Sequence, residues 1–176
     1  MPVDSALLPA QTVRLAALGI LAEAERPYAD LAREVADFIR CILGQSLDLM
    51  GTSLELLRVE GLIEAVAGTG IGDNVGMRLT PAGDAALRRL LAAGLHAPGS
   101  ELNHLVLALK LRFLPLLGED ARHRQLALIG EWYAGEIVRL EQLCARHAGR
   151  SPQFRRWIER ETDLARERLG ELAALG

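Results

Sequence analysis

Side chains that commonly carry catalysis or bind metals are few in this sequence, and their spacing does not build a site. Cys144 and His147 stand three positions apart, which would place both on one helix face, but a zinc site needs more ligands than these two. The other histidines, His96, His104 and His123, flank a loop or lie between arginines, so solvated positions explain them. No serine or cysteine nucleophile stands beside a turn with a histidine partner in a recognisable order. We therefore expect no metal, no cofactor and no enzymatic activity.

The glycine-rich segment GTGIGDNVG at residues 68–76 is the other feature that could do chemistry, because such loops can cradle phosphates. Its glycine spacing matches neither a dinucleotide-binding motif nor a P-loop. Short β-capable runs flank it at residues 62–66 and 77–79, whereas a phosphate-binding loop joins a strand to a helix. The segment is therefore interpreted as the flexible turn of a β-hairpin.

Helices are expected on both sides of this hairpin. Before it, Met50, Leu54 and Leu57 recur at helical spacing; after it, Thr80 can cap a helix that begins with a proline. Helix, hairpin, helix is the order of a winged helix-turn-helix. Further helices are predicted at residues 7–25 and 28–43, a candidate recognition helix at 46–60, and helices at 81–93, 101–117, 119–148 and 152–175. The 176-residue chain, 50% hydrophobic and 4% aromatic, should be mostly α.

Two segments, LRVEGLIEAV at residues 57–66 and MRLTPAGDAAL at residues 77–87, resemble the winged-helix core of PadR-type transcriptional regulators. The second half resembles the PadR and AphA-like dimerisation region, because LKLRFL at residues 109–114 precedes a long helix and a last helix that carries Trp157. One departure is Arg26-Pro27, where the family usually has His-Gly. The resemblance implies an α+β winged helix with a two-stranded wing in residues 1–93 and an antiparallel helical dimerisation region in residues 100–176. It also implies a homodimeric repressor that binds double-stranded operator DNA.

The candidate DNA contacts lie on the recognition helix and the wing. They are polar or basic side chains: Gln45, Ser46, Thr52, Ser53, Arg58 and Arg78. The charge of the N-terminal half argues against DNA binding. Residues 1–91 hold eight arginines and twelve acidic residues, which gives a net charge of −4 in the half that should meet phosphates. The alternative is a winged-helix protein-interaction module that keeps the dimer and has lost DNA binding.

Three aromatic residues are candidates for ligand binding. Trp132, Tyr133 and Trp157 would line a mostly apolar pocket between subunits, and the resemblance implies a small aromatic effector, since PadR-like regulators often respond to phenolic or drug-like molecules. The alternative is that these rings are packed dimer core.

The remaining composition indicates a cytoplasmic protein without a membrane span. Cys41 and Cys144 stand among helix-forming residues as two reduced thiols, and the N-terminus has no basic flank or sustained apolar core for export. The apolar residues 102–117 are interrupted by charged side chains and a proline. The net charge of −3 argues against a protein that coats nucleic acid through bulk charge.

Overall fold

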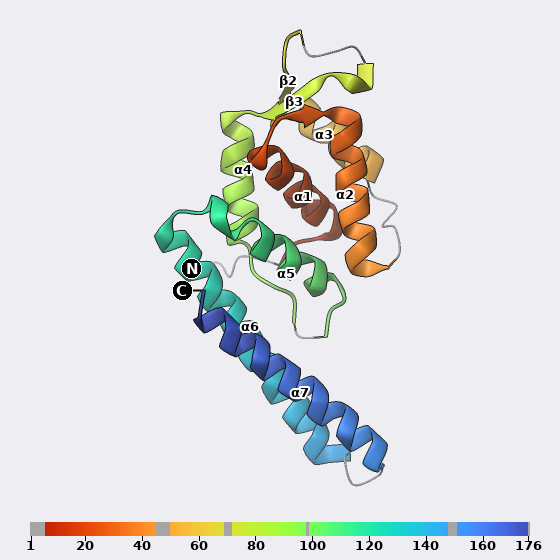
Figure 1. Cartoon of the computed structure of the whole chain (residues 1–176), viewed down its shortest axis with the longest axis vertical. Coiled ribbons are helices and arrows are strands. Elements are labelled where there is room, and N and C mark those ends of the chain that lie inside the picture. Colours follow the sequence, from red (N-terminus) through yellow and green to blue (C-terminus); the bar gives the residue numbers. More distant parts are fainter. Residues whose placement is uncertain (1–5, 45–49, 69–71, 98, 148–150, 176) are drawn as a thin grey trace.

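The protein is mostly helical with one small antiparallel sheet, as the sequence predicts. The computed structural model describes residues 6–44, 50–68, 72–97, 99–147 and 151–175, and the side chains of residues 50–53 and 73 are outside the description. In chain order the elements are α1 (Pro9–Glu23), β1 (Arg26–Pro27), α2 (Tyr28–Leu43), α3 (Met50–Val59), β2 (Ile63–Ala65), η1 (Gly72–Asn74), β3 (Gly76–Leu79), α4 (Pro81–Ala92), α5 (Leu102–Arg112), η2 (Leu114–Leu116), α6 (Glu119–His147) and α7 (Pro152–Ala173) (Figure 1).

Helix α1 forms the centre of the N-terminal half. Its residues Val13, Leu15, Leu18 and Ile20 are fully buried, and the helix contacts α2, α3, α4, α5 and β3. Figure 1 shows α1 inside a frame made by α2, α4 and α5. A helix that is apolar on nearly every side must be enclosed in this way. The candidate recognition helix and the wing therefore both pack against this buried helix.

Helix α3 ends at Gly61, which adopts a left-handed backbone conformation that favours glycine. Gly61 has φ +69°, its N–H donates to the carbonyl of Arg58 at 3.1 Å, and the N–H of Leu62 donates to the carbonyl of Leu57 at 2.9 Å. This pair of hydrogen bonds is a Schellman motif, in which glycine avoids the steric cost of a Cβ. The chain consequently leaves α3 in one fixed direction and enters β2. The predicted start of this helix at residue 46 lies outside the described residues.

The wing is the antiparallel pair β2–β3, and a third strand extends it. The strand order is β1-β3-β2, with Glu64 opposite Arg78 in the wing and Arg26 opposite Met77 in the added strand. The sequence predicted two strands and missed β1, because two residues carry no alternating pattern. Pro27 suits this position at the edge of the sheet, since it has no N–H to donate.

Thr80 and Gly83 fasten the wing to α4. The hydroxyl of Thr80 accepts the N–H of Gly83 at 3.0 Å and donates to the carbonyl of Gly61 at 2.7 Å, so the predicted helix cap also binds the end of α3. Gly83 packs so closely that a Cβ there would lie 2.0 Å from the carbonyl oxygen of Leu62. The end of α3, the wing and the start of α4 are thereby joined.

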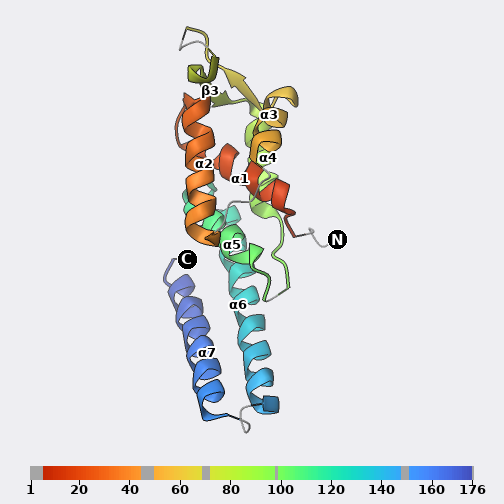
Figure 2. The same ribbon diagram turned by 90° about the vertical axis from the view of Figure 1, so that its right-hand side faces the viewer.

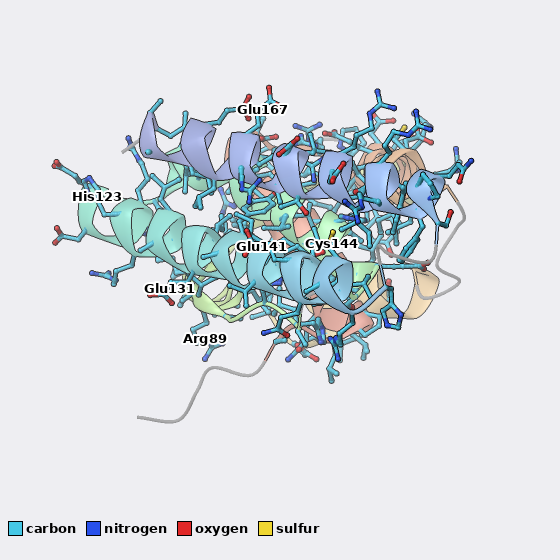
Figure 3. The ribbon with its side chains drawn as sticks, turned by 90° about the horizontal axis from the view of Figure 1, so that it is seen from below. Arg89, His123, Glu131, Glu141, Cys144 and Glu167 are labelled. Carbon is cyan, nitrogen blue, oxygen red and sulfur yellow. The ribbon has the colours of Figure 1, made fainter. Side chains whose placement is uncertain are left out.

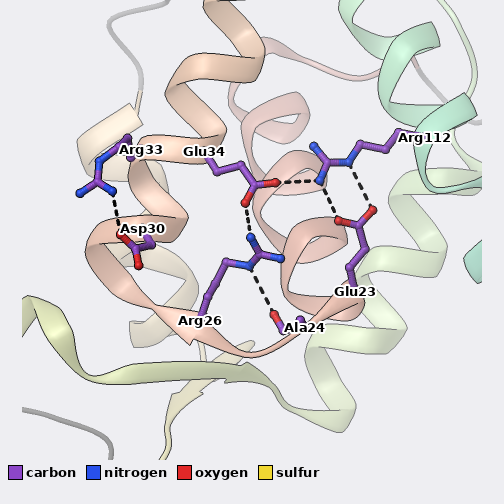
Figure 4. A network of polar contacts seen from close by, with 7 residues as sticks. All are labelled: Glu23, Ala24, Arg26, Asp30, Arg33, Glu34 and Arg112. Atoms are coloured by element: carbon purple, nitrogen blue, oxygen red, sulfur yellow. Dashed lines mark hydrogen bonds and ion pairs between the residues drawn. The ribbon is translucent and has the colours of Figure 1, made fainter.

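Helix α5 is held on the N-terminal half by a polar network (Figure 4). Arg112 donates to Glu23 of α1 and to Glu34 of α2, both at 2.7 Å, and Glu34 also pairs with Arg26. Hydrogen bonding from Arg112 to Glu23 is the main reason that the pKa of Arg112 is raised above its ordinary value. The guanidinium also lies over the ring of Phe38, 5.3 Å from its centroid. The network ties α5 to α1 and α2.

The predicted helix over residues 101–117 is shorter than expected. Helix α5 ends at Arg112, and the 3-10 turn η2 follows at Leu114–Leu116. Pro115 explains the difference, because proline has no N–H for the helical ladder and disfavours helical geometry in the residue before it.

Lys110 joins α4, α5 and α6 from within the core. Its Nζ donates to the carbonyls of Leu91 and Ala93 at the end of α4, the latter at 2.7 Å, and to Gln125 Oε1 of α6 at 2.9 Å. The side chain is 1% exposed, and its hydrogen-bond partners among the described residues include no carboxylate. Burial lowers the pKa of Lys110 to about 8. An ammonium group therefore links the two halves of the molecule.

Helices α6 and α7 form an antiparallel hairpin that extends away from the N-terminal half (Figures 1 and 2). The Ser151 hydroxyl accepts the N–H of Phe154 at 3.3 Å and caps α7. Residues facing α6 are buried along α7, namely Ile158, Thr162, Ala165 and Leu172. The wing and this hairpin lie at opposite ends of the molecule.

Among the described residues, none of the helices combines the length and apolar composition that crossing a bilayer requires.

Candidate functional site

Helix α3 presents one face to α1 and the other to solvent. Leu54 and Leu57 are buried, at 2% and 0% exposure, and pack on the N-terminal core. The side chains on the opposite face are exposed: Glu55, Leu56, Arg58 and Val59. The end of α3 lies next to the wing, because α3 leads directly into β2 through Gly61 and contacts that strand. A helix held in this way beside a hairpin is the arrangement that winged helices use to enter the major groove.

The predicted DNA contacts fall into three groups in the structure. Gln45 and Ser46 lie outside the described residues. Thr52 and Ser53 belong to the first turns of α3, and their side chains are outside the description. Arg58 and Arg78 are both described and exposed, one in the last turn of α3 and the other on β3.

Both described arginines are paired with carboxylates. Arg58 lies 3.1 Å from Glu55, three residues earlier on α3, and Arg78 lies 2.8 Å from Glu64, its partner across the wing. Glu60, just after α3, pairs with Arg14 of α1. Exposed pairs of this kind are worth about 0 to 1 kcal/mol each, so a phosphate can displace the carboxylate, although the acid remains nearby and repels it. The pairs therefore reduce the positive potential of this surface without removing the cations.

Most other arginines of the described N-terminal half are also paired with carboxylates. On α2, Arg33 pairs with Asp30 and Arg40 with Asp37, both at 2.8 Å. The side chain of Arg89 on α4 has no hydrogen bond or ion pair to any other residue that the structure describes, and Figure 3 shows it pointing away from α7. The described N-terminal half thus has few uncompensated cations.

The aromatic residues predicted to bind a ligand do not share one cavity within a single protomer. Trp132 and Tyr133 meet edge to face with centroids 5.0 Å apart, and the Trp132 indole N–H donates to the carbonyl of His96 at 2.9 Å. They line a small cavity of about 70 Å³. Trp157 is 53% exposed on α7, stacks on Phe154 and lines a separate depression.

The remaining groups with chemical potential lie on α6. Figure 3 shows Cys144 and Glu141 along α6, and both line a groove that α7 completes. Within the described ranges, no set of three His, Cys, Asp or Glu side chains comes together as metal ligands would.

Comparison with known protein families identifies the family of this chain. The model of a family described as AphA-like transcriptional regulators matches residues 3–176, nearly the whole chain. This chain belongs to the AphA-like transcriptional regulator family. The match confirms the PadR/AphA-like resemblance found in the sequence, and it identifies a family of regulators rather than of enzymes. A search among curated proteins found no match.

Several solved structures are similar to this AphA-like regulator. Smu.1604c from Streptococcus mutans UA159 is 17% identical with a TM-score of 0.38, covering 92% of this chain and 96% of that one. PadR from Bacillus subtilis is 19% identical with a TM-score of 0.38, covering 97% and 96%. The same protein in complex with operator DNA is 18% identical with a TM-score of 0.36, covering 92% and 96%. Because the scores lie below 0.5, the assignment rests on the family match and the fold described above.

Sequence reasoning missed two residues of this AphA-like chain that shape the site. Arg14 reaches Glu60 from α1, a pairing between residues 46 positions apart that no local pattern reveals. Gly83 belongs to the segment that carries the resemblance, but the physical reason for a glycine there, its contact with Leu62, becomes visible only once the wing is folded. Lys110 is buried, and the one available signal was its place between apolar residues on both sides.

Proposed function

We propose that this AphA-like regulator binds double-stranded operator DNA as a homodimer and acts as a repressor. In this proposal α3 enters the major groove and the β2–β3 wing contacts the phosphate backbone. The observation that carries it is the placement of α3, whose Leu54 and Leu57 side is packed on α1 while its other side faces solvent beside the wing. Family membership supports the same role.

Dimerisation is assigned to the α6–α7 hairpin. Large apolar side chains remain exposed on it, namely Val138 at 50%, Trp157 at 53% and Leu164 at 39%. A second copy of the chain would cover such residues in a two-fold interface. We accordingly propose a DNA-binding unit in residues 1–93 and a dimerisation unit in residues 100–176, with α5 packed on α1 and α2 as their connection. A regulator acting on DNA belongs in the cytoplasm.

An aromatic effector remains part of the proposal and depends on the dimer. Trp132, Tyr133 and Trp157 line separate depressions in one protomer, so a shared pocket requires the partner hairpin. The exposure of Trp157 supports a role at that interface.

A second candidate function is protein binding without DNA binding. Two observations favour it: the ion pairs of Arg58 and Arg78 with carboxylates, and the exposure of Leu56 at 42% and Val59 at 74% on the outer face of α3. Exposed apolar side chains of this size suit a protein partner better than a phosphate backbone.

Substitution of Arg58 distinguishes the two functions. An operator is first obtained by selection from genomic fragments, and Arg58→Ala is then titrated against it. Loss of a base contact should weaken binding by about 1 to 3 kcal/mol, or about 5- to 150-fold. Arg139→Ala is the matched control, because Arg139 likewise pairs with a glutamate three residues earlier but lies on α6. Equal affinity of the two variants would remove Arg58 from the interface.

A further inference from the structure

The solvent-facing side of α3 carries an exposed leucine. Leu56 is 42% exposed, and Val59, three residues later on the same side of the helix, is 74% exposed. Leu54 and Leu57, by contrast, are buried where α3 packs on α1. Single exposed leucines are common on protein surfaces and need no explanation. Leu56 differs from these because it lies on the helix that we propose to enter the major groove.

The glutamates on either side of Leu56 are held in ion pairs within the chain. Glu55 lies 3.1 Å from Arg58, and Glu60 pairs with Arg14 of α1. Each carboxylate thus has a cation close by, which reduces its repulsion of phosphates. A duplex that approaches this side of α3 therefore meets paired charges around one partly exposed apolar side chain.

Leu56 lies farther into the proposed groove than Val59. Val59 is the last residue of α3, after which the chain turns at Gly61 and enters β2. The wing is proposed to contact phosphates, so this end of α3 lies toward the backbone of the duplex. Recognition helices contact base edges with their N-terminal part, and Thr52, one of the predicted DNA contacts, stands one helical turn before Leu56. Leu56 is therefore the exposed apolar side chain of α3 that is better placed to reach a base.

Thymine is the base that offers a leucine an apolar partner. Its edge in the major groove carries the C5 methyl group beside the O4 acceptor, whereas cytosine presents the N4 amino group there. The purines present N7 with either O6 or the N6 amino group. A leucine placed against one of these polar groups would remove water from it without providing a hydrogen bond, which costs free energy. The chemistry of Leu56 therefore favours thymine over the other three bases.

We propose that Leu56 contacts the C5 methyl group of one thymine in each half-site of the operator, and that this contact makes T·A the preferred base pair at that position. The inference rests on the proposed function, because it requires α3 in the major groove. It adds an apolar, specificity-determining residue to the polar and basic side chains that the sequence predicts as DNA contacts.

The test removes the methyl group from the DNA and the leucine from the protein, separately and together. Thymines of an operator obtained by selection are replaced, one symmetric pair at a time in the two half-sites, by deoxyuridine, which lacks only the methyl group. Fluorescence anisotropy measures the affinity of the full-length protein for each duplex. Leu56→Ala and Leu56→Gln both remove the apolar contact, and the second keeps the length of the side chain. Leu111→Ala is the matched control, because Leu111 is exposed to a similar degree, 38%, but lies on α5.

At one thymine position, deoxyuridine should weaken binding of the wild type and of Leu111→Ala about four- to fifteenfold, the effect of one buried methyl group in one half-site or in both. Both Leu56 variants should bind the thymine and deoxyuridine duplexes equally, with the affinity of the wild type for the deoxyuridine duplex. The inference is overturned if no thymine shows the loss, or if the loss persists in both Leu56 variants. It is also overturned if both variants lose binding to the deoxyuridine duplex, since Leu56 would then act through something other than the methyl group.

Failure of the inference and failure of the proposed function give different results. Selective operator binding without a deoxyuridine effect overturns the role of Leu56 and leaves the proposed function standing. Absence of selective binding to any genomic fragment overturns both, and would assign the exposed side of α3 to a protein partner.

Discussion

Lys110 offers the sharpest test of how the two halves are joined. It is 1% exposed and donates to two carbonyls at the end of α4 and to Gln125 of α6. Lys110→Met keeps most of the side-chain volume and removes both the charge and the donors. The carbonyls of Leu91 and Ala93 and the Gln125 oxygen would then lose their partner, which destabilises the fold.

The pH dependence of this effect has a definite sign. Burial lowers the folded-state pKa of Lys110 from 10.5 to about 8. Between these values the unfolded chain binds more protons than the folded one, so the free energy of unfolding rises with pH. This gain in stability is lost as pH falls through 8. The shift corresponds to about 3 kcal/mol at most, and most of it develops between pH 7 and pH 10. The wild type should therefore gain about 2 to 3 kcal/mol over Lys110→Met across that interval.

Urea unfolding of both proteins at pH 7 and pH 10 measures this difference, because titrations elsewhere in the chain occur in both and cancel. The ¹³C resonance of the single lysine reports its pKa directly. A titration midpoint near 10.5, or a stability difference that does not vary with pH, would refute the buried ammonium and the joint built on it.

Three further substitutions test the wing, its charge and the dimer. Gly83→Ala should lower the free energy of unfolding by about 1 to 3 kcal/mol in urea titrations, because its Cβ would meet the Leu62 carbonyl, while Gly118→Ala, which has open space, should not. Glu64→Gln should tighten operator binding several-fold and steepen its salt dependence, since Arg78 is freed for phosphate; unchanged affinity would place the wing away from DNA. Trp157→Glu should shift the protein to monomers in light scattering, because a charge would enter the proposed interface, and an intact dimer would move that interface elsewhere.

Most helix boundaries could be predicted because they depend on local chemistry. Thr80 and Ser151 each precede a proline and cap the helix that follows, and Gly61 ends α3 because it adopts a positive φ. The pair of Glu55 and Arg58 could also have been expected from their spacing of three residues.

The features that escaped prediction depend on contacts between distant segments. Strand β1 exists only through its pairing with β3, and Arg14 meets Glu60 across 46 positions. In the sequence Lys110 is one of the charged residues that interrupt an apolar segment, whereas the structure buries it against carbonyls from another helix.

Binding of the purified protein to a pool of genomic fragments, at low and then at physiological salt, tests whether this regulator recognises DNA by sequence. We expect saturable, sequence-selective binding that weakens steeply as salt rises, because a few arginines on α3 and the wing must exchange carboxylate partners for phosphates. Absence of selective binding at both salt concentrations would contradict it, and would assign the exposed face of α3, with Leu56 and Val59, to a protein partner.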